Sequence, residues 1–294
     1  MGALSCFRGT FPMLSYRHGF HAGNHADVLK HSVVVQLLQY LIQKDKPFWY
    51  IDTHAGAGAY ALHEGFAAKT GESETGIARL WGRTDLPVLL KEYVDAVRLL
   101  NPDGVLRYYP GSPYLASQLS RDIDKLRLYE MHSSEIEVLR NNFSDLGGRR
   151  VMLYGDDGFD GLKAMLPPPS RRGLTLIDPS YEDKRDYHRT LGTLEDALKR
   201  FATGTYAVWY PQVQRLESQR FAEQLKRLQP KGWLHVSLTI SAPPMGGLGL
   251  FGSGMFILNP PYTLHKALAA SMPYLVKLLG QDSSAKFTLE HKAA

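Results

Sequence analysis

The chain has 294 residues, with 44% hydrophobic residues, 21% charged residues and a formal net charge of +5. This composition is typical of a folded domain, and no stretch is long and apolar enough to span a bilayer, so we expect no membrane association. The mildly basic balance favours a polyanionic partner, although a slightly basic cytosolic enzyme fits it equally well. The single cysteine, Cys6, excludes an internal disulfide framework and a multi-cysteine metal site, so we expect a reducing, cytoplasmic location.

The first third of the chain predicts one helix, one strand and an insertion. Residues 1–12 lack the apolar core of a signal peptide and are interpreted as a dispensable extension. Residues 24–46 predict a helix that Asn24 caps, and residues 48–58 predict a strand that runs into a glycine turn. Residues from about 60 to 109 contain short helical segments between turns, so we expect a small helical insertion there.

The remainder predicts an α/β domain. Ser112 is expected to cap the next helix, with Pro113 at its first position. Strands and helices then alternate, which implies a parallel sheet covered on both faces. The last two strands, residues 233–241 and 253–261, have no helix between them and should pair antiparallel. Seven strands that end in a hairpin are the layout of a Rossmann-like class I methyltransferase.

We expect this domain to span residues 13–280 and residues 281–294 to be a loose tail. In such a sheet, ligands bind beyond the carboxyl ends of the parallel strands. Acids end three successive predicted strands, at Glu130, Asp157 and Asp178. A carboxylate at Glu130 suits ribose hydroxyls, and one at Asp157, followed by Gly158, suits an adenine amino group. Taken individually, Glu130 and Asp157 are better explained as solvated loop acids, but three acids at three successive strand ends together favour a nucleoside cofactor.

The glycine turn after the first strand gives weaker support. Residues 52–58 read Asp-Thr-His-Ala-Gly-Ala-Gly, and Ala61 stands where a dinucleotide fingerprint has its third glycine. S-adenosylmethionine fits better than a dinucleotide because it has no pyrophosphate. A plain tight turn explains the glycines about as well.

The fourth strand ends in Asp-Pro-Ser-Tyr, residues 178–181, which suits methylation of an aromatic amine. Such an amine is a poor nucleophile until acceptors bind its N–H groups. Asp178 and the Pro179 carbonyl are predicted to supply these acceptors, and Tyr181 a face for the target base. Asn-Pro-Pro-Tyr at 259–262 matches the amine-methylating pattern more literally. Because its strand should be antiparallel, we interpret it as a structural turn at the opposite sheet edge.

The segment around the start of the first helix is rich in polar side chains, including Tyr16, His21, His25, Lys30 and His31. We favour a polar active-site arm over a zinc site, because no thiol or carboxylate cluster completes a tetrahedral set. Basic residues that flank the fourth strand suit phosphate binding, and a charged rim explains them nearly as well: Arg171, Arg172, Lys184 and Arg185.

Five motifs resemble a known family. "MLSYRHGFHAGNHADVLKH", "DTHAGAG", "RYYPGSP", "DGF" and "GLTLIDPSYE" are similar to the RlmJ-type 23S ribosomal RNA adenine-N6 methyltransferases. The resemblance extends from Met13 to about Leu279. It implies a Rossmann-like fold with a helical insertion, S-adenosylmethionine as methyl donor, and an adenine of 23S rRNA as substrate, on protein-free or partly assembled RNA. We expect a monomer without a metal.

Residue roles follow from the same resemblance. Asp178 is the implied catalytic acceptor, Tyr16 an RNA contact, and Lys30 a residue close to the substrate. The implied cofactor contacts are His31, His54, Ser112, Glu130, Asp157 and Gly158. Two features depart from the family: Ser180 replaces a second proline, which spares both proposed acceptors, and residues 1–12 have no counterpart.

Other functions fit the same turn. A DNA adenine or a protein glutamine side chain is also a planar amine. A non-catalytic RNA-binding assembly factor that retains the fold is the third reading.

Overall fold

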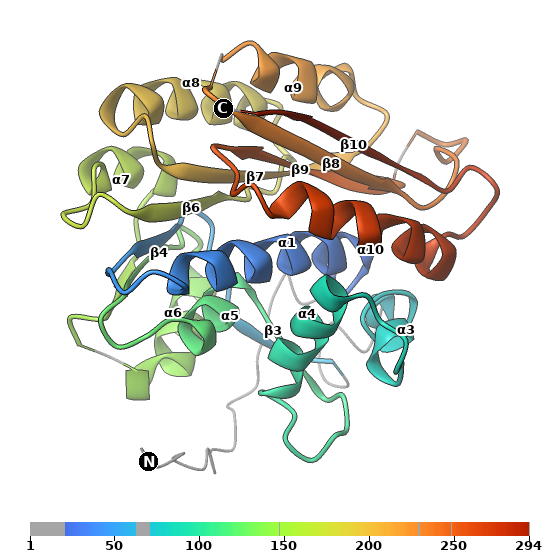
Figure 1. Cartoon of the computed structure of the whole chain (residues 1–294), viewed down its shortest axis with the longest axis horizontal. Coiled ribbons are helices and arrows are strands. Elements are labelled where there is room, and N and C mark those ends of the chain that lie inside the picture. Colours follow the sequence, from blue (N-terminus) through green and yellow to red (C-terminus); the bar gives the residue numbers. More distant parts are fainter. Residues whose placement is uncertain (1–20, 63–70, 147, 229, 248, 294) are drawn as a thin grey trace.

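The computed structural model describes residues 21–62, 71–146, 148–228, 230–247 and 249–293. Its main sheet has eight strands in the order β10-β8-β9-β7-β6-β1-β4-β5 (Figure 1). The strands are β1 (Trp49–Asp52), β4 (Lys125–Tyr129), β5 (Val151–Tyr154), β6 (Gly173–Ile177), β7 (Thr205–Gln212), β8 (Trp233–Thr239), β9 (Gly252–Leu258) and β10 (Lys286–Lys292). Neighbouring strands from β5 to β7 are parallel, whereas β9 is antiparallel to both β7 and β8. The predicted Rossmann-like fold is confirmed.

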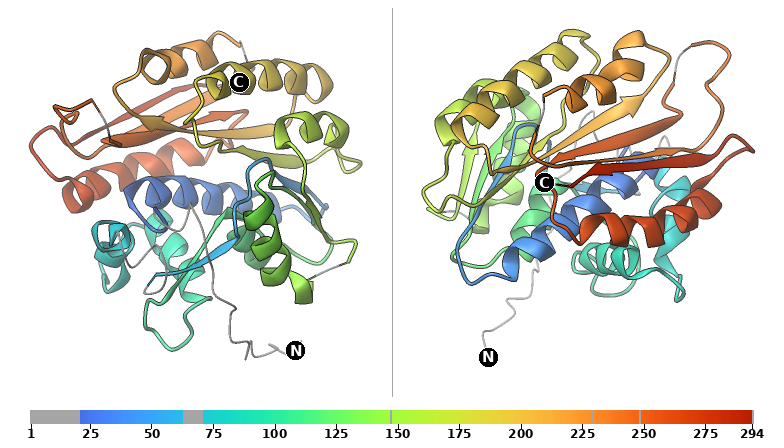
Figure 2. Two further views of the ribbon diagram at one scale, coloured as in Figure 1. Left: turned by 180° about the vertical axis from the view of Figure 1, so that it is seen from behind. Right: turned by 45° about the horizontal axis from the view of Figure 1, so that its top comes forward.

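Helices cover both faces of the sheet (Figures 1 and 2). One face carries α1 (His25–Ile42), α5 (Ser112–Leu119), α6 (Ser133–Asn142) and α10 (Leu264–Leu279), and the other α7 (Gly158–Met165), α8 (Arg185–Arg200) and α9 (Leu216–Lys226). A short turn of 3-10 helix, η3 (Ser144–Leu146), follows α6. Alternate residues of β6 serve the two cores: Leu176 packs with the α1 layer and Ile177 with the other. This alternation is what a central strand buried on both faces requires.

The order of the strands reverses between β1 and β6. From β1 the chain proceeds outward to β4 and β5, and then returns to β6 on the other side of β1. A crevice forms at such a switch point because the connections leave the two strands in opposite directions. The carboxyl ends of β1 and β6 therefore mark the expected ligand site.

The insertion follows β1 and packs against α1. Strands β2 (Ala59–Ala61) and β3 (Tyr108–Pro110) pair antiparallel, and between them lie η2 (Glu72–Thr75), α3 (Ala78–Trp81) and α4 (Val88–Arg98). Glu72 accepts hydrogen bonds from His21 Nδ1 and Asn24 Nδ2, each at 2.9 Å. A Cβ on Gly76 would lie 2.0 Å from the carbonyl oxygen of Gly23, so only glycine permits this close approach.

Helix starts agree with the prediction at one position and differ at the other. Asn24 caps α1, because its side chain accepts hydrogen bonds from the backbone N–H groups of Ala26 and Asp27. Ser112, predicted to be a cap, is instead the first residue of α5, and Gly111 is the cap. The Ser112 hydroxyl donates a hydrogen bond to the buried Asp52 carboxylate at 2.7 Å and does not cap the helix.

The prediction of a loose C-terminal tail is wrong. Residues 286–292 form β10, which pairs antiparallel with β8 along its whole length and makes the sheet eight-stranded. The pairing relies on backbone hydrogen bonds and on Glu290, which binds Lys226 and His235. The segment has only a short hydrophobic alternation, Phe287 and Leu289 between polar residues, which the prediction of a loose tail did not take into account. The predicted extension, residues 1–12, lies outside the described residues.

Candidate active site

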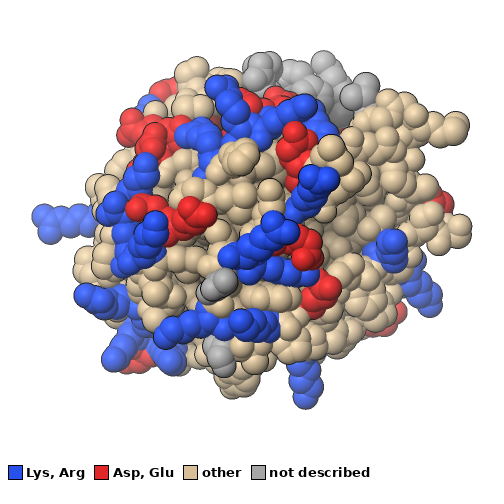
Figure 3. All heavy atoms as spheres, turned by 90° about the horizontal axis from the view of Figure 1, so that it is seen from above, with Lys and Arg blue, Asp and Glu red and all other residues tan. Residues whose placement is uncertain are grey.

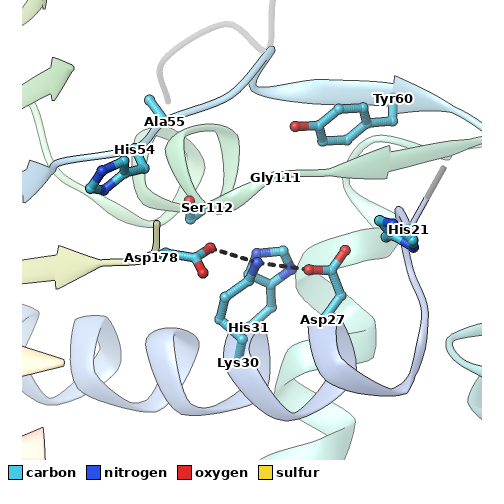
Figure 4. Close-up of a pocket in the computed structure, with 10 residues that line it drawn as sticks. All are labelled: His21, Asp27, Lys30, His31, His54, Ala55, Tyr60, Gly111, Ser112 and Asp178. Carbon is cyan, nitrogen blue, oxygen red and sulfur yellow. Dashed lines mark hydrogen bonds and ion pairs between the residues drawn. The ribbon is translucent and has the colours of Figure 1, made fainter. Parts of the chain in front are cut away.

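A cavity of about 350 Å³, counting space open to solvent, lies at the reversal point of the sheet (Figure 4). Helix α1, the turn after β1, the start of α5 and the end of β6 surround it. Its lining residues are His21, Asp27, Lys30, His31, His54, Ala55, Tyr60, Gly111, Ser112 and Asp178. The structure thus brings together five of the predicted site residues: Lys30, His31, His54, Ser112 and Asp178.

Lys30 joins two carboxylates in this cavity. Its Nζ lies 2.8 Å from Asp178 Oδ2 and 2.8 Å from Asp27 Oδ1. Asp178 directly follows β6, whereas Asp27 and Lys30 lie one turn apart on α1, so the pairing ties the helix to the sheet. Figure 4 shows the lysine between the two acids. All three side chains are largely buried, so the single lysine is shared by two desolvated carboxylates.

The two carboxylates differ in their electrostatics. Burial raises the pKa of Asp178 to about 6, against the opposing effect of Lys30. For Asp27, burial also acts upward, but Lys30 and His31 outweigh it and hold the pKa well below its ordinary value. Burial acts to lower the pKa of Lys30, yet both acids outweigh it, so the lysine stays charged. Asp178 is therefore the member of this group that can exchange a proton near neutral pH.

Asp52 is a functional candidate that the sequence analysis left out. It ends β1, is 0% exposed, and accepts hydrogen bonds from Tyr50 at 2.8 Å and Ser112 at 2.7 Å. Burial raises its pKa to about 6. Its only signal in the sequence was its place at a strand end. Asp27 had a similar signal, its spacing of three residues from Lys30, which places both on one side of the helix.

The two histidines approach the cavity from different elements. His31 Nδ1 lies 2.7 Å from the Tyr109 hydroxyl, which is 2.9 Å from the Tyr93 hydroxyl. These contacts fix the His31 ring against the insertion. His54 Nδ1 lies 2.8 Å from Thr53 Oγ1, and its ring meets Phe159 edge-on at 4.8 Å.

The other three predicted cofactor contacts lie along the same sheet edge, outside the residues that line the cavity. Glu130 follows β4, and its two oxygens accept the backbone N–H groups of Gly56 at 2.8 Å and His132 at 2.7 Å. Asp157 caps α7 and pairs with Arg189 at 2.5 Å. A Cβ on Gly158 would lie 2.0 Å from the Thr53 carbonyl oxygen, so the start of α7 lies directly against the residue that follows β1.

This edge fits the nucleoside part of S-adenosylmethionine. A carboxylate oxygen that accepts one N–H keeps a second lone pair, so Glu130 retains capacity for hydroxyl groups. Asp157 is an acceptor one strand further on. Gly58, in the turn after β1, has a φ of +83°, which favours glycine and keeps the turn free of side chains.

The prediction that Tyr181 offers a stacking face is wrong for this structure. Its side chain is 2% exposed, and its hydroxyl donates to the Trp209 carbonyl at 2.8 Å. The ring packs against Tyr187 and Phe221 in the core beneath α8 and α9. A positive φ of 55° turns the residue inward after the two preceding turn residues. Trp209 lies 5.6 Å from Lys30 Nζ and is the aromatic ring nearest to that lysine's charge among the described contacts.

The second turn lies at the opposite edge, as predicted. The Asn259 amide donates to the carbonyls of Ala202 and Gly204, just before β7. Its backbone N–H donates to Gly232, just before β8. Asn259 therefore connects the amino ends of two strands and cannot reach the cavity.

Three expectations concern features outside this cavity. Tyr16 lies outside the described residues. Among the residues that the structure describes, His, Cys, Asp and Glu form no group of three or more suited to a metal ion. No helix in that part of the chain has the length and apolar character that a membrane span needs.

A Rossmann-like sheet, a glycine turn after β1 and acids after β4, β5 and β6 together define a class I methyltransferase, which uses S-adenosylmethionine. Residues 45–291 match the family described as "Ribosomal RNA large subunit methyltransferase D, RlmJ". Ribosomal RNA large subunit methyltransferase J of Haemophilus influenzae is 46% identical over 279 residues, which are 95% of this chain and 98% of that protein. The protein of the same name from Escherichia coli is 47% identical over 90% of this chain and 93% of its own length.

A solved structure agrees with these relatives. Protein LPL1258 from Legionella pneumophila is 36% identical, with a TM-score of 0.82, over 92% of this chain and 98% of that one. The chain belongs to the RlmJ family of ribosomal RNA large subunit methyltransferases. The family resemblance, the enzyme class and the cofactor predicted from the sequence are confirmed.

Proposed function

We propose that this protein methylates the N6 amino group of an adenine in 23S rRNA and that Asp178 is its catalytic acceptor. The observation that supports the proposal best is the position of Asp178. It directly follows β6 beside the reversal of strand order and lines the cavity, and Lys30 holds one of its oxygens. The names of the relatives point to the same class of substrate, since both are methyltransferases of large-subunit ribosomal RNA.

The chemistry follows from the need to activate a weak nucleophile. S-adenosylmethionine, when bound, would supply an electrophilic methyl group, whose bond to sulfur breaks as the N–C bond forms and leaves the electron pair on the sulfur. The free oxygen of Asp178 and the Pro179 carbonyl accept the two N–H bonds of the adenine amine, so its lone pair becomes available for the new N–C bond. Lys30 fixes the orientation of the carboxylate through the other oxygen.

The amine loses one proton when the N–C bond forms. Asp178 is suited to take that proton, because burial has raised its pKa to about 6 and the carboxylate is still largely ionised at neutral pH. The proton then passes from the carboxyl group to solvent through the open side of the cavity. Ser180 donates or accepts nothing in this scheme, which is why its difference from the family's proline is compatible with activity.

The cofactor contacts belong to the same proposal. Glu130 would bind the ribose hydroxyls and Asp157, with Gly158, the adenine end, while His31, His54 and Ser112 line the side nearest to Asp178. Tyr16 is proposed as an RNA contact on the basis of the resemblance. A monomer is expected, and partly assembled or protein-free RNA is the expected substrate form.

The test is mass-spectrometric mapping of methyladenine in rRNA from a deletion strain, with complementation by wild type and by Asp178→Ala. We expect one adenine to lose its N6 methyl group in the deletion strain and to regain it only with wild type. An adenine that stays modified in every ribosome of the deletion strain would contradict the proposal. Transfer of labelled methyl groups to DNA or protein pools rather than RNA would favour the alternative substrates, and rescue by Asp178→Ala would favour a non-catalytic assembly factor.

A further inference from the structure

A second basic region lies at the amino ends of the central strands, opposite to the active site. The register pairs Trp49 with Lys125 and with Gly173, and Leu126 with Val151, so β1, β4, β5 and β6 begin at one edge. β6 is five residues long, which separates its two ends by about 17 Å at roughly 3.3 Å per residue. The region is therefore too far from Asp178 to contribute to the chemistry.

This edge concentrates positive charge. Residues 44–46, 121–125, 149–150 and 171–172 contain eight Lys and Arg and three Asp, an excess of five, which equals the net charge of the whole chain. One of the three acids, Asp124, is buried and pairs with Arg121 at 3.0 Å. The remaining cations form no ion pair with any residue in the described ranges: Lys44, Lys46, Lys125, Arg149, Arg150, Arg171 and Arg172.

Backbone carbonyls hold three of these arginines together. Arg121 donates to the carbonyls of Lys44 and Lys46, and Arg172 also donates to that of Lys46. Arg150 donates to the carbonyl of Arg121. Burial and the charge of Arg121 lower the pKa of Arg172, so the two guanidinium groups repel one another at close range. Among the described residues, one buried carboxylate, Asp124, pairs with this group of three arginines, so a net positive field remains outside the edge.

The face that α8 and α9 cover is different. Figure 3 shows Lys and Arg intermixed with Asp and Glu across it. Five of its cations are in ion pairs: Lys184 with Glu217, Arg185 with Asp183, Arg189 with Asp157, Arg200 with Asp196, and Lys226 with Glu223 and Glu290. Exposed pairs of this kind neutralise one another and attract a polyanion weakly.

An exposed aromatic ring adjoins the basic edge. Tyr262, the last residue of the turn that the proposed reaction does not use, is 86% exposed. The centre of its ring lies 6.2 Å from that of Tyr40, in an edge-on arrangement. Tyr40 in turn lies close enough to Arg172 to influence the pKa of that guanidinium group. A solvent-facing tyrosine beside unpaired cations suits a nucleic acid, because bases stack on the ring while the cations contact phosphates.

We propose that Lys44, Lys46, Arg149, Arg171 and Tyr262 form a second RNA-binding surface, here called the amino-edge surface, which binds substrate RNA remote from the target adenine. The inference rests on the proposed function, since it takes the same RNA as the partner. The cations contact phosphates and Tyr262 stacks on an unpaired base. The surface thus contributes affinity for a large folded RNA, and the cavity selects the adenine.

The experiment compares two matched variants of the full chain. The first carries Lys44→Gln, Lys46→Gln, Arg149→Gln and Arg171→Gln, all at exposed side chains. The control carries Lys91→Gln, Arg220→Gln, Lys277→Gln and Lys286→Gln, which removes the same charge from exposed side chains away from the amino ends of the central strands. Binding to protein-free 23S rRNA is measured across a salt series, and methyl transfer is measured on that RNA and on a short hairpin around the target adenine.

We expect the first variant to show a KM on 23S rRNA raised about tenfold or more, with kcat unchanged and the hairpin methylated as by wild type. Its slope of log affinity against log salt should be shallower by about 3, at roughly 0.7–0.9 per phosphate contact. Tyr262→Ala should weaken binding to 23S rRNA without changing the salt slope. Equal affinity and slope in wild type and the first variant, or an equal loss in the control, would overturn the inference. Wild type that transfers no methyl group to either RNA would instead refute the proposed function, while the binding data would still decide the surface.

Discussion

Two turns in this chain have nearly the same sequence and opposite roles. Asp-Pro-Ser-Tyr follows β6 and Asn-Pro-Pro-Tyr follows β9, and each contains a residue with a positive φ: 55° at Tyr181 and 52° at Asn259. In the first turn the acid faces the cavity and the tyrosine is buried. In the second turn the amide is bound to backbone carbonyls and the tyrosine is exposed.

Strand direction explains the difference. β6 is parallel to β1, so its carboxyl end lies at the cofactor edge, whereas β9 is antiparallel to β7 and ends at the other edge. A short motif that matches a catalytic pattern is thus insufficient without the topology that delivers it. The more literal match is the structural turn.

The largest difference between the two turns is expected when the polar side chain that begins each turn, Asp178 or Asn259, is replaced by alanine. Asp178→Ala should lower kcat for methyl transfer by about 10²–10³-fold, the usual loss for one preorganised polar contact in a transition state. Cofactor binding, measured by calorimetry, should be largely kept because β1 separates Asp178 from Glu130, and both β1 and β4 separate it from Asp157. An Asp178→Ala enzyme with wild-type kcat would break the comparison.

Asn259→Ala should have the opposite profile. The side chain donates two hydrogen bonds, at 2.9 and 2.7 Å, and the residue has a left-handed backbone that alanine tolerates poorly. We expect the free energy of unfolding to fall by about 2–3 kcal/mol, from roughly 1 kcal/mol for each of these three effects. Urea denaturation gives the free energy, and kcat at a permissive temperature should stay unchanged. Asn259→Gly should lose less unfolding free energy than Asn259→Ala, because glycine tolerates the left-handed backbone but also lacks the two side-chain hydrogen bonds.

The two tyrosines should differ on a smaller scale. Tyr181→Phe removes a buried hydroxyl that donates to the Trp209 carbonyl, and should cost about 1 kcal/mol of unfolding free energy. Tyr262→Phe should cost nothing measurable in the same denaturation experiment, because its side chain is exposed. Equal stability of the two variants would mean that the Tyr181 hydroxyl is not held as described.

The smallest expected effect is a shift in the pH dependence of kcat. It concerns only the turn after β6, which contains Asp178. Wild-type kcat should fall as the pH drops through about 6, because Asp178 then gains a proton and one acceptor oxygen is lost. Asp27→Asn leaves Lys30 to Asp178 alone and removes a neighbouring negative charge. Both effects lower the pKa of Asp178, so the acidic limb should move to lower pH. A limb that stays in place or moves upward would show that Asp178 does not titrate as its surroundings require.

The sequence was sufficient for the parts that repeat and insufficient for the parts that depend on distant contacts. Alternating strands and helices gave the sheet, and the helix-free connection after β8 gave the direction of β9, which was enough to choose Asp178 over Asn259. The sequence indicated only one of the two ion pairs of Lys30. The spacing of Asp27 and Lys30 places them on one side of α1, but it does not reveal that Asp178 also contacts Lys30. The burial of Tyr181 depends on α8 and α9, and β10 on backbone pairing with β8. No local pattern encodes either contact.

The bond between the insertion and the first turn of α1 has a mechanical consequence. Glu72 holds His21 and Asn24, and the Gly76 backbone lies directly against Gly23, so the joint has no slack. Lys30 lies less than two turns further along the same helix. A displacement of the insertion would therefore move the start of α1 with it, and so would shift the Lys30 ammonium group that binds Asp178.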